Sequence, residues 1–109
     1  MANLVILESA QRELEEIAQL HKNLVGPHSA RNITDLILDT LSHVEMFPLS
    51  GHIPRDKELR NGGYRYVIAG KYICMYRLIG EEVYVYHIAH GERNYPTLFK
   101  RLLKEDCLD

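Results

Sequence analysis

The segment from residue 64 to residue 90 places the strongest constraint on the fold of this 109-residue chain. It contains three runs in which side chains alternate as they do in half-buried strands. Ala69-Gly70 and Gly80-Glu81 separate the runs and fit tight hairpin turns, because glycine adopts the positive φ that such turns require. The segment is therefore predicted to be a three-stranded antiparallel meander. Its strands are predicted at residues 64–68, 71–79 and 83–90.

The first half of the chain has the pattern of one short strand and two helices. Residues 4–7 form an apolar run typical of a buried strand. Apolar side chains then recur every three or four residues over residues 9–25 and again over 28–46. Gly26-Pro27 lies between the two segments and is suited to end one helix and begin the next, and Ser9 can cap the first helix. The two helices are predicted to pair antiparallel on one face of the meander.

Each predicted helix has an apolar and a polar side. In the first helix the apolar side is formed by Ala10, Leu14, Ile17, His21 and Leu24, and the polar side by Arg12, Glu13, Glu15, Glu16 and Gln19. In the second helix the apolar side is formed by Ile33, Leu36, Ile37, Thr40, Leu41 and Val44. The apolar sides are expected to cover the sheet.

The remaining segments complete an α+β fold. Residues 48–62 hold two prolines and two glycines and are predicted to form a loop. Pro96 is suited to begin a short terminal helix with Leu98, Phe99, Leu102 and Leu103 on its apolar side. The predicted order is an N-terminal strand, an antiparallel helix pair, a three-stranded antiparallel meander and a short C-terminal helix. By its size the chain is expected to be one domain, residues 1–109.

Charges and aromatic residues indicate a binding surface. Residues 1–51 carry 3 basic and 7 acidic side chains, whereas residues 52–104 carry 10 basic and 5 acidic ones. All seven tyrosines lie between residues 64 and 95, more amphipathic aromatics than one small sheet usually needs for packing. A basic second half predicts one electropositive, partner-binding region. Its expected members are Arg55, Lys57, Arg60, Arg65, Lys71, Arg77 and Arg93.

Composition favours a cytoplasmic protein without a cofactor. No run approaches the roughly 18 apolar residues of a membrane span, and the N-terminus lacks the basic start of a signal peptide. Cys74 and Cys107 occur without a Cys-x-x-Cys motif and are expected to be reduced thiols. His87 and His90 are three residues apart on a strand and would point to opposite faces, so no metal site is predicted.

The order of elements and several short motifs resemble the RelE/ParE superfamily, the toxins of type II toxin–antitoxin systems. The resemblance covers nearly the whole chain and implies a cognate antitoxin whose tail is disordered alone and folds on the toxin. The motifs are Pro48…Gly51, Leu59-Arg60, Gly63-Tyr64-Arg65, the strand Tyr72-Ile-Cys-Met-Tyr76-Arg77 and the ending His90-Gly-Glu-Arg93-Asn-Tyr95.

The superfamily has two branches with different activities. RelE-like members cleave mRNA on the ribosome and carry an arginine on the middle strand of the meander, after an aromatic residue and three residues before a tyrosine. Here that position is Ile73, between Tyr72 and Tyr76. ParE-like members keep the fold, lack the nuclease residues and inhibit DNA gyrase by binding it. The resemblance at Ile73 therefore implies a ParE-like gyrase inhibitor.

Two alternatives remain open from the sequence. The first is a ribosome-dependent mRNA endonuclease, in which metal-free cleavage would need a proton carrier and cations around the phosphate. His90 suits the proton transfer, and Tyr95 could stack a base or shuttle a proton. However, the arginines could also be charges on a strand face, the tyrosines sheet packing, and His90 a partner for a backbone group. The second alternative is a non-toxic module that only binds antitoxin. The catalytic set of a nuclease would be His90, Arg93, Tyr95, Arg65 and Arg77.

Overall fold

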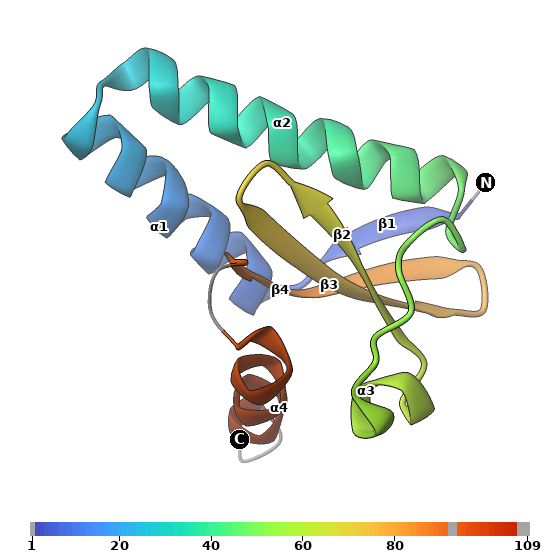
Figure 1. Ribbon diagram of the computed structural model, residues 1–109. Helices are drawn as coiled ribbons and strands as arrows, with labels where there is room; N and C mark the ends of the chain where they lie inside the picture. Colours follow the sequence, from blue (N-terminus) through green and yellow to red (C-terminus); the bar gives the residue numbers. More distant parts are fainter. Residues whose placement is uncertain (1, 92–93, 107–109) are drawn as a thin grey trace.

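The computed structural model describes residues 2–91 and 94–106, and it has the predicted α+β order (Figure 1). One short helix was not predicted. It lies within residues 48–62, and Asp56 caps it by accepting a hydrogen bond from the Leu59 amide at 3.1 Å. The elements are β1 (Asn3–Ile6), α1 (Glu8–Leu24), α2 (Pro27–Met46), α3 (Lys57–Asn61), β2 (Tyr64–Ala69), β3 (Tyr72–Ile79), β4 (Glu82–His90) and α4 (Tyr95–Asp106). Among the described residues no helix is long and apolar enough to cross a membrane.

The four strands form one sheet in the order β1-β4-β3-β2. The antiparallel meander is confirmed, and β1 joins it in parallel beside β4, with Leu4 opposite Val83. The turn at Gly80-Glu81 is also confirmed, with Gly80 at φ 62°. The first turn lies one residue later than predicted, because Ala69 still pairs with Tyr72 and the turn consists of Gly70 and Lys71.

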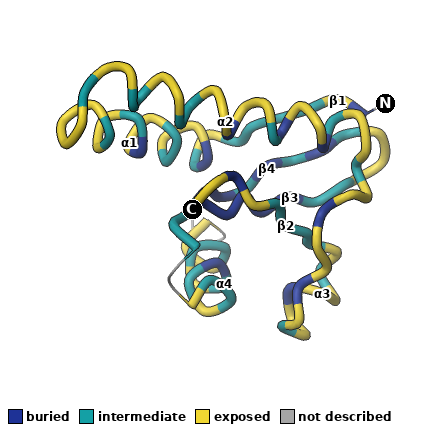
Figure 2. Tube along the Cα trace, turned by 45° about the horizontal axis from the view of Figure 1, so that its top comes forward, coloured by how far each residue is buried: buried dark blue, intermediate teal, exposed yellow. Residues whose placement is uncertain are grey.

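Helices cover both faces of the sheet (Figure 2). The prediction that α1 and α2 lie together on one face is confirmed, and α3 and α4 lie on the other (Figure 1). The α1–α2 face buries Ala10, Ile17, Ile37, Leu41, Val44, Ala69, Tyr72, Cys74, Tyr76, Val83, Val85 and Ile88. The α3–α4 face buries Leu59, Ile73, Met75 and Phe99, with Tyr64, Tyr66, Tyr86 and Tyr95 packed against them. Cys74 is a buried free thiol, whereas Cys107 lies outside the described residues.

Two expectations for α1 were wrong. The helix begins at Glu8, so Ser9 lies within its first turn, and its N-cap Leu7 makes no side-chain cap. Leu24 was assigned to the buried stripe, yet it is 74% exposed. The end of the α1–α2 hairpin extends past the edge of the sheet, so this residue has no sheet beneath it (Figure 1).

Tyr76 attaches the segment after α2 to the sheet. Its buried hydroxyl donates to the Pro48 carbonyl at 2.7 Å and accepts from the Gly51 amide at 3.0 Å. A Cβ on Gly51 would lie 2.4 Å from the same hydroxyl oxygen, so only glycine fits there. Burial raises the pKa of Tyr76, although the Gly51 amide opposes this.

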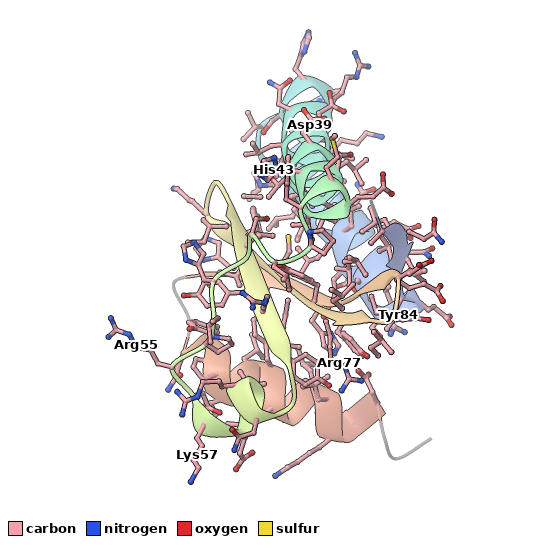
Figure 3. All side chains as sticks on the ribbon, turned by 90° about the vertical axis from the view of Figure 1, so that its right-hand side faces the viewer. Asp39, His43, Arg55, Lys57, Arg77 and Tyr84 are labelled. Atoms are coloured by element: carbon pink, nitrogen blue, oxygen red, sulfur yellow. The ribbon has the colours of Figure 1, made fainter. Side chains whose placement is uncertain are left out.

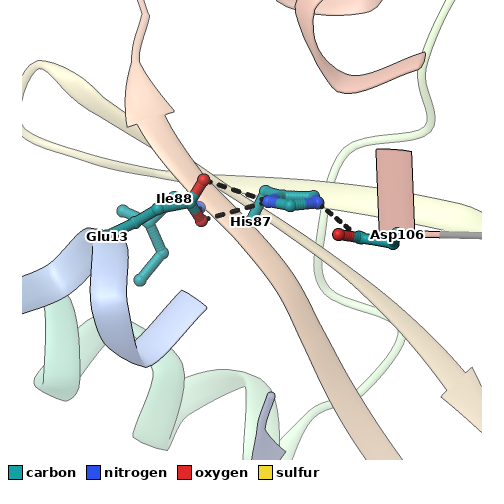
Figure 4. A network of polar contacts seen from close by, with 4 residues as sticks. All are labelled: Glu13, His87, Ile88 and Asp106. Carbon is teal, nitrogen blue, oxygen red and sulfur yellow. Dashed lines mark hydrogen bonds and ion pairs between the residues drawn. The ribbon is translucent and has the colours of Figure 1, made fainter. Parts of the chain in front are cut away.

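His87 attaches α4 to α1 through the sheet (Figure 4). The pairing of β3 with β4 shifts register between Met75 and Tyr76, a β-bulge that directs His87 towards α4. The imidazole is 2% exposed and stacks on Phe99 at 6.4 Å. Its Nδ1 lies 3.0 Å from Glu13 Oε2 and its Nε2 lies 2.8 Å from Asp106 Oδ2.

The state of this ion pair follows from its partners. Ionised carboxylates only accept hydrogen bonds, so two of them beside the ring favour a His87 imidazole that carries a proton on both nitrogens. Burial alone would lower the pKa of His87, but the carboxylates of Glu13 and Asp106 outweigh it and raise the pKa. Glu13 also accepts a hydrogen bond from the Ile88 amide at 3.0 Å. Glu13 was predicted to lie on the polar side of α1, opposite the apolar stripe, and the structure instead directs its carboxylate to the Ile88 amide of β4.

We predict that His87→Gln lowers the free energy of unfolding more at pH 6 than at pH 9. A group whose folded pKa is raised stabilises fully below its unfolded pKa of about 6.5, and this stabilisation is lost as pH rises through the folded pKa. The expected loss at pH 6 is about 1.5–3 kcal/mol, typical of hydrogen bonds to a charged group. Urea unfolding followed by circular dichroism measures it.

Leu59→Ala is the control for this prediction. It removes buried apolar volume on the same face of the sheet without removing a titratable group. Leu59→Ala should lower the free energy of unfolding by a similar amount at pH 6 and at pH 9. Equal losses at pH 6 and pH 9 for His87→Gln as well would mean that the ring contributes packing alone.

Candidate functional site

The structure does not bring the predicted nuclease residues together. His90 pairs with Tyr72, and their rings lie 5.5 Å apart. Arg77 lies on β3 with Tyr72, five residues further along, which separates their Cα atoms by about 17 Å. An odd separation on a strand also places two side chains on opposite faces. His90 and Arg77 therefore cannot act on one phosphate in this arrangement.

Arg65 is on the opposite face of the sheet from Arg77. Arg65 of β2 pairs with Tyr76 of β3, whereas Arg77 of β3 pairs with Tyr64 of β2. Because Tyr76 and Arg77 are adjacent on β3, their side chains point to opposite faces. Arg65 Nη1 donates to the carbonyls of Leu49 at 3.3 Å and Gly51 at 3.1 Å. The guanidinium thus holds the same segment that Tyr76 attaches to the sheet, which is a structural role.

Arg77 packs between two tyrosine rings. Its guanidinium carbon lies 4.8 Å from the centroid of Tyr64 and 5.3 Å from that of Tyr86. Nη2 donates to the Tyr86 hydroxyl at 2.7 Å and Nη1 to the Gly62 carbonyl at 3.3 Å. Its buried Nε has no hydrogen-bond partner among the described residues. These contacts hold the charge against the sheet.

Tyr95 belongs to the core under α4. Its ring lies 5.1 Å from that of Tyr66 and 6.0 Å from that of Phe99. Burial, with a hydrogen bond to Tyr66, raises the pKa of Tyr95 to about 12. Arg93 lies outside the described residues.

Ile73 is buried where the RelE-like branch carries its arginine. The side chain is 6% exposed and belongs to the cluster that includes Phe99 of α4. Ile73 also leaves little room for a side chain at position 91, since a Cβ on Gly91 would lie 3.1 Å from Ile73 Cγ1. A packed aliphatic side chain at this position cannot supply a cation.

The predicted basic region is divided. Arg55, Lys57 and Arg60 gather at α3, a group called the α3 basic cluster here, and Figure 3 shows the first two extending away from the protein body. None of the three pairs with a carboxylate of the described residues. The intervening Asp56 instead pairs with Lys100 of α4 at 2.9 Å, which lowers the pKa of Asp56. Lys71 lies in the turn before β3, about 20 Å from Arg77 along that strand.

A cleft of about 770 Å³ lies between α1, the end of β4 and α4. His90 lies in its wall beside Tyr72, and burial raises the pKa of Tyr72. The Tyr72 hydroxyl lies 3.0 Å from His21 Nε2, which links the cleft to the helix hairpin. This α1–α4 cleft is lined by Glu13, Glu16, Ile17, Leu20, Tyr72, Ile88, Ala89, His90, Leu98 and Leu102.

This cleft was not predicted from the sequence. Glu13, Glu16 and Leu20 lie three or four residues apart, so their shared stripe on α1 could be read from the spacing. No sequence signal indicated that α4 lies opposite that stripe. Within the described residues, no three histidine, cysteine or carboxylate side chains are placed to hold a metal ion.

Comparisons with known proteins agree with the fold and identify the family. The family model described as the ParE toxin of the type II toxin–antitoxin system parDE matches residues 4–95. A chain from the chromosomal ParDE system of P. aeruginosa superposes with a TM-score of 0.70 at 18% identity, covering 83% of this chain and 96% of that one. A chain from the RelBE2 toxin–antitoxin complex of Mycobacterium tuberculosis gives a TM-score of 0.54 at 20% identity, covering 82% and 96%. No curated protein sequence matches significantly. The chain belongs to the ParE toxin family of type II toxin–antitoxin systems.

Proposed function

We propose that this ParE family member arrests growth by binding DNA gyrase, without cleaving RNA. The separation of His90 from Arg77, about 17 Å along the sheet and on opposite faces, is the observation that carries the proposal. Charge stabilisation needs donors about 3 Å from the reacting oxygens. Ile73 supports the same proposal, since a buried aliphatic side chain stands where the resemblance places an arginine in RelE-like nucleases.

The proposal includes an antitoxin that binds and neutralises this chain. The superposed chains come from a ParDE toxin–antitoxin system and from a RelBE2 toxin–antitoxin complex. A tail that folds on the toxin can cover a large surface with a short chain. The α1–α4 cleft provides uncovered apolar surface for such a tail.

The α3 basic cluster is the part of the predicted partner-binding set that we assign to gyrase. Gyrase acts while it holds DNA, and unpaired cations on a protein surface favour a partner that carries phosphates. Arg55, Lys57 and Arg60 have no competing carboxylate among the described residues. Arg60 donates to the Arg55 carbonyl at 3.2 Å and is still exposed. Arg65 and Arg77, by contrast, are half-buried and bond to the segment after α2 and to Tyr86.

Expression without antitoxin should stop DNA replication before protein synthesis, and the purified chain should inhibit supercoiling by gyrase. His90→Ala should change that inhibition by less than about threefold, because loss of a proton carrier costs about 10²–10⁴-fold only where proton transfer occurs. Supercoiling assays and ribosomes programmed with mRNA are run in parallel.

Two results would contradict the proposal. Codon-positioned mRNA cuts that disappear in His90→Ala, with supercoiling unaffected, would establish the endonuclease alternative. Antitoxin binding without growth arrest would establish the non-toxic binding module.

Reversing charge in the α3 basic cluster should weaken gyrase inhibition. The double variant Lys57→Glu and Arg60→Glu is expected to require at least about tenfold more protein for half-inhibition, and the difference should shrink as salt rises. The double variant Lys22→Glu and Arg31→Glu changes net charge by the same amount at exposed cations of α1 and α2, and as the matched control it should act like the unmodified chain. Equal weakening by this control would mean that net charge, and not the α3 basic cluster, attracts gyrase.

A further inference from the structure

We propose that the α1–α4 cleft receives an apolar side chain of the antitoxin, with a neighbouring lysine or arginine of the antitoxin bound to Glu16. The inference rests on the proposed function, which supplies the antitoxin as partner. It adds where a segment of that partner docks and what chemistry the segment must have.

The charge of the cleft selects a cation. Glu16 is exposed at the rim and forms no hydrogen bond or ion pair with any described residue. Glu13 also lines the cleft, but His87 and the Ile88 amide already engage its carboxylate. No lysine or arginine is among the described residues that line the cleft. An uncompensated carboxylate at the edge of an apolar surface is complementary to a basic side chain.

The walls of the cleft select an apolar neighbour for that cation. Leu20 is 51% exposed although it borders the buried Ile17 on the same helix. From the other wall, Leu98 and Leu102 of α4 face the same space, and Ile88 forms part of its floor. A volume of about 770 Å³ is within the range of clefts that enclose ligands. Glu16 and Leu20 are one turn apart, so one partner segment can reach both.

The cleft is held open before any partner binds. Glu13 belongs to the α1 wall and Asp106 to α4, and His87 bonds both. The spacing between the two helices is therefore set by an internal ion pair. A preformed groove between two helices fits the entry of a short amphipathic segment that orders on binding. Because the groove is already formed, the entropy cost of ordering on binding falls on the antitoxin segment alone.

The test measures antitoxin affinity with matched pairs of variants on α1. The probe is the product of the antitoxin reading frame next to this gene, titrated by calorimetry into the full-length chain. Glu16→Lys should weaken binding about tenfold and Leu20→Ser about thirtyfold, as expected for central contacts of an interface. The controls are Glu15→Lys and Leu24→Ser, which are exposed on the same helix outside the cleft. Each control should stay within twofold, and circular dichroism checks folding of all four.

A charge exchange identifies the cation. Each lysine and arginine of the antitoxin is replaced by glutamate in turn. One of these variants should lose affinity for the unmodified chain and recover at least fivefold with Glu16→Lys, because two residues in contact do not contribute additively.

The outcomes separate this inference from the proposed function. Tight antitoxin binding that is equally sensitive to Glu16→Lys and Glu15→Lys, and equally sensitive to Leu20→Ser and Leu24→Ser, would overturn the docking site and leave the toxin function intact. Failure of the antitoxin to bind the unmodified chain would overturn both. Failure of every charge exchange would overturn the ion pair with Glu16.

Discussion

A buried imidazole between two carboxylates determines where the C-terminal helix lies, and most of the functional surface depends on it. Burying a charged ring is costly unless it is paired and fully hydrogen-bonded, and breaking such a pair costs more than the pair contributes. His87 meets this condition through Glu13 and Asp106, from opposite sides of the sheet edge. With α4 held in this position, Ile73 is covered and the α1–α4 cleft acquires its second wall. One ion pair thus holds α4 over Ile73 and forms a groove between α4 and α1.

The tyrosines illustrate how a surface signal in a sequence can have an internal explanation. Their number predicted a sheet that presents a binding face, yet most of their polar groups bond within the chain. Tyr76 bonds the segment after α2, Tyr72 bonds His21, and Tyr86 bonds Arg77. A sheet with helices on both faces needs side chains that fill apolar space and still satisfy a polar group at the far end. Here the hydroxyls attach loops and helices to the sheet, while the exposed large apolar residues lie mainly on α1, α2 and the segment that follows α2.

The sequence predicted those features that depend on local pattern. The alternation at residues 64–90 and Gly80 give the meander, and Gly26-Pro27 gives the break between the helices. Features that depend on distant partners were missed. The bulge at His87 has no marker in the sequence, and the role of Glu13 requires knowing that an open strand edge lies beside α1. The α3 helix is too short to show periodicity, although Asp56 supplies its cap. The assumption that the basic residues of the second half share one surface failed for Arg65 and Arg77. Arg65 pairs with Tyr76, the neighbour of Arg77, and adjacent residues of a strand point to opposite faces.

The α3 basic cluster and the α1–α4 cleft differ in charge, which has consequences for how toxicity and neutralisation can be combined. The α3 basic cluster suits a partner that carries phosphates, whereas the α1–α4 cleft suits an apolar and basic segment. Under our two proposals these surfaces are distinct, so an antitoxin segment in the cleft would not by itself cover the contact with gyrase. Neutralisation would then require a further part of the antitoxin to reach α3 or to obstruct gyrase by its bulk. An acidic stretch beyond the cleft-binding segment is the simplest solution, because it would compete for the same cations that attract the DNA-bound target. Antitoxin variants that occupy only the α1–α4 cleft should consequently bind the toxin and yet leave it active.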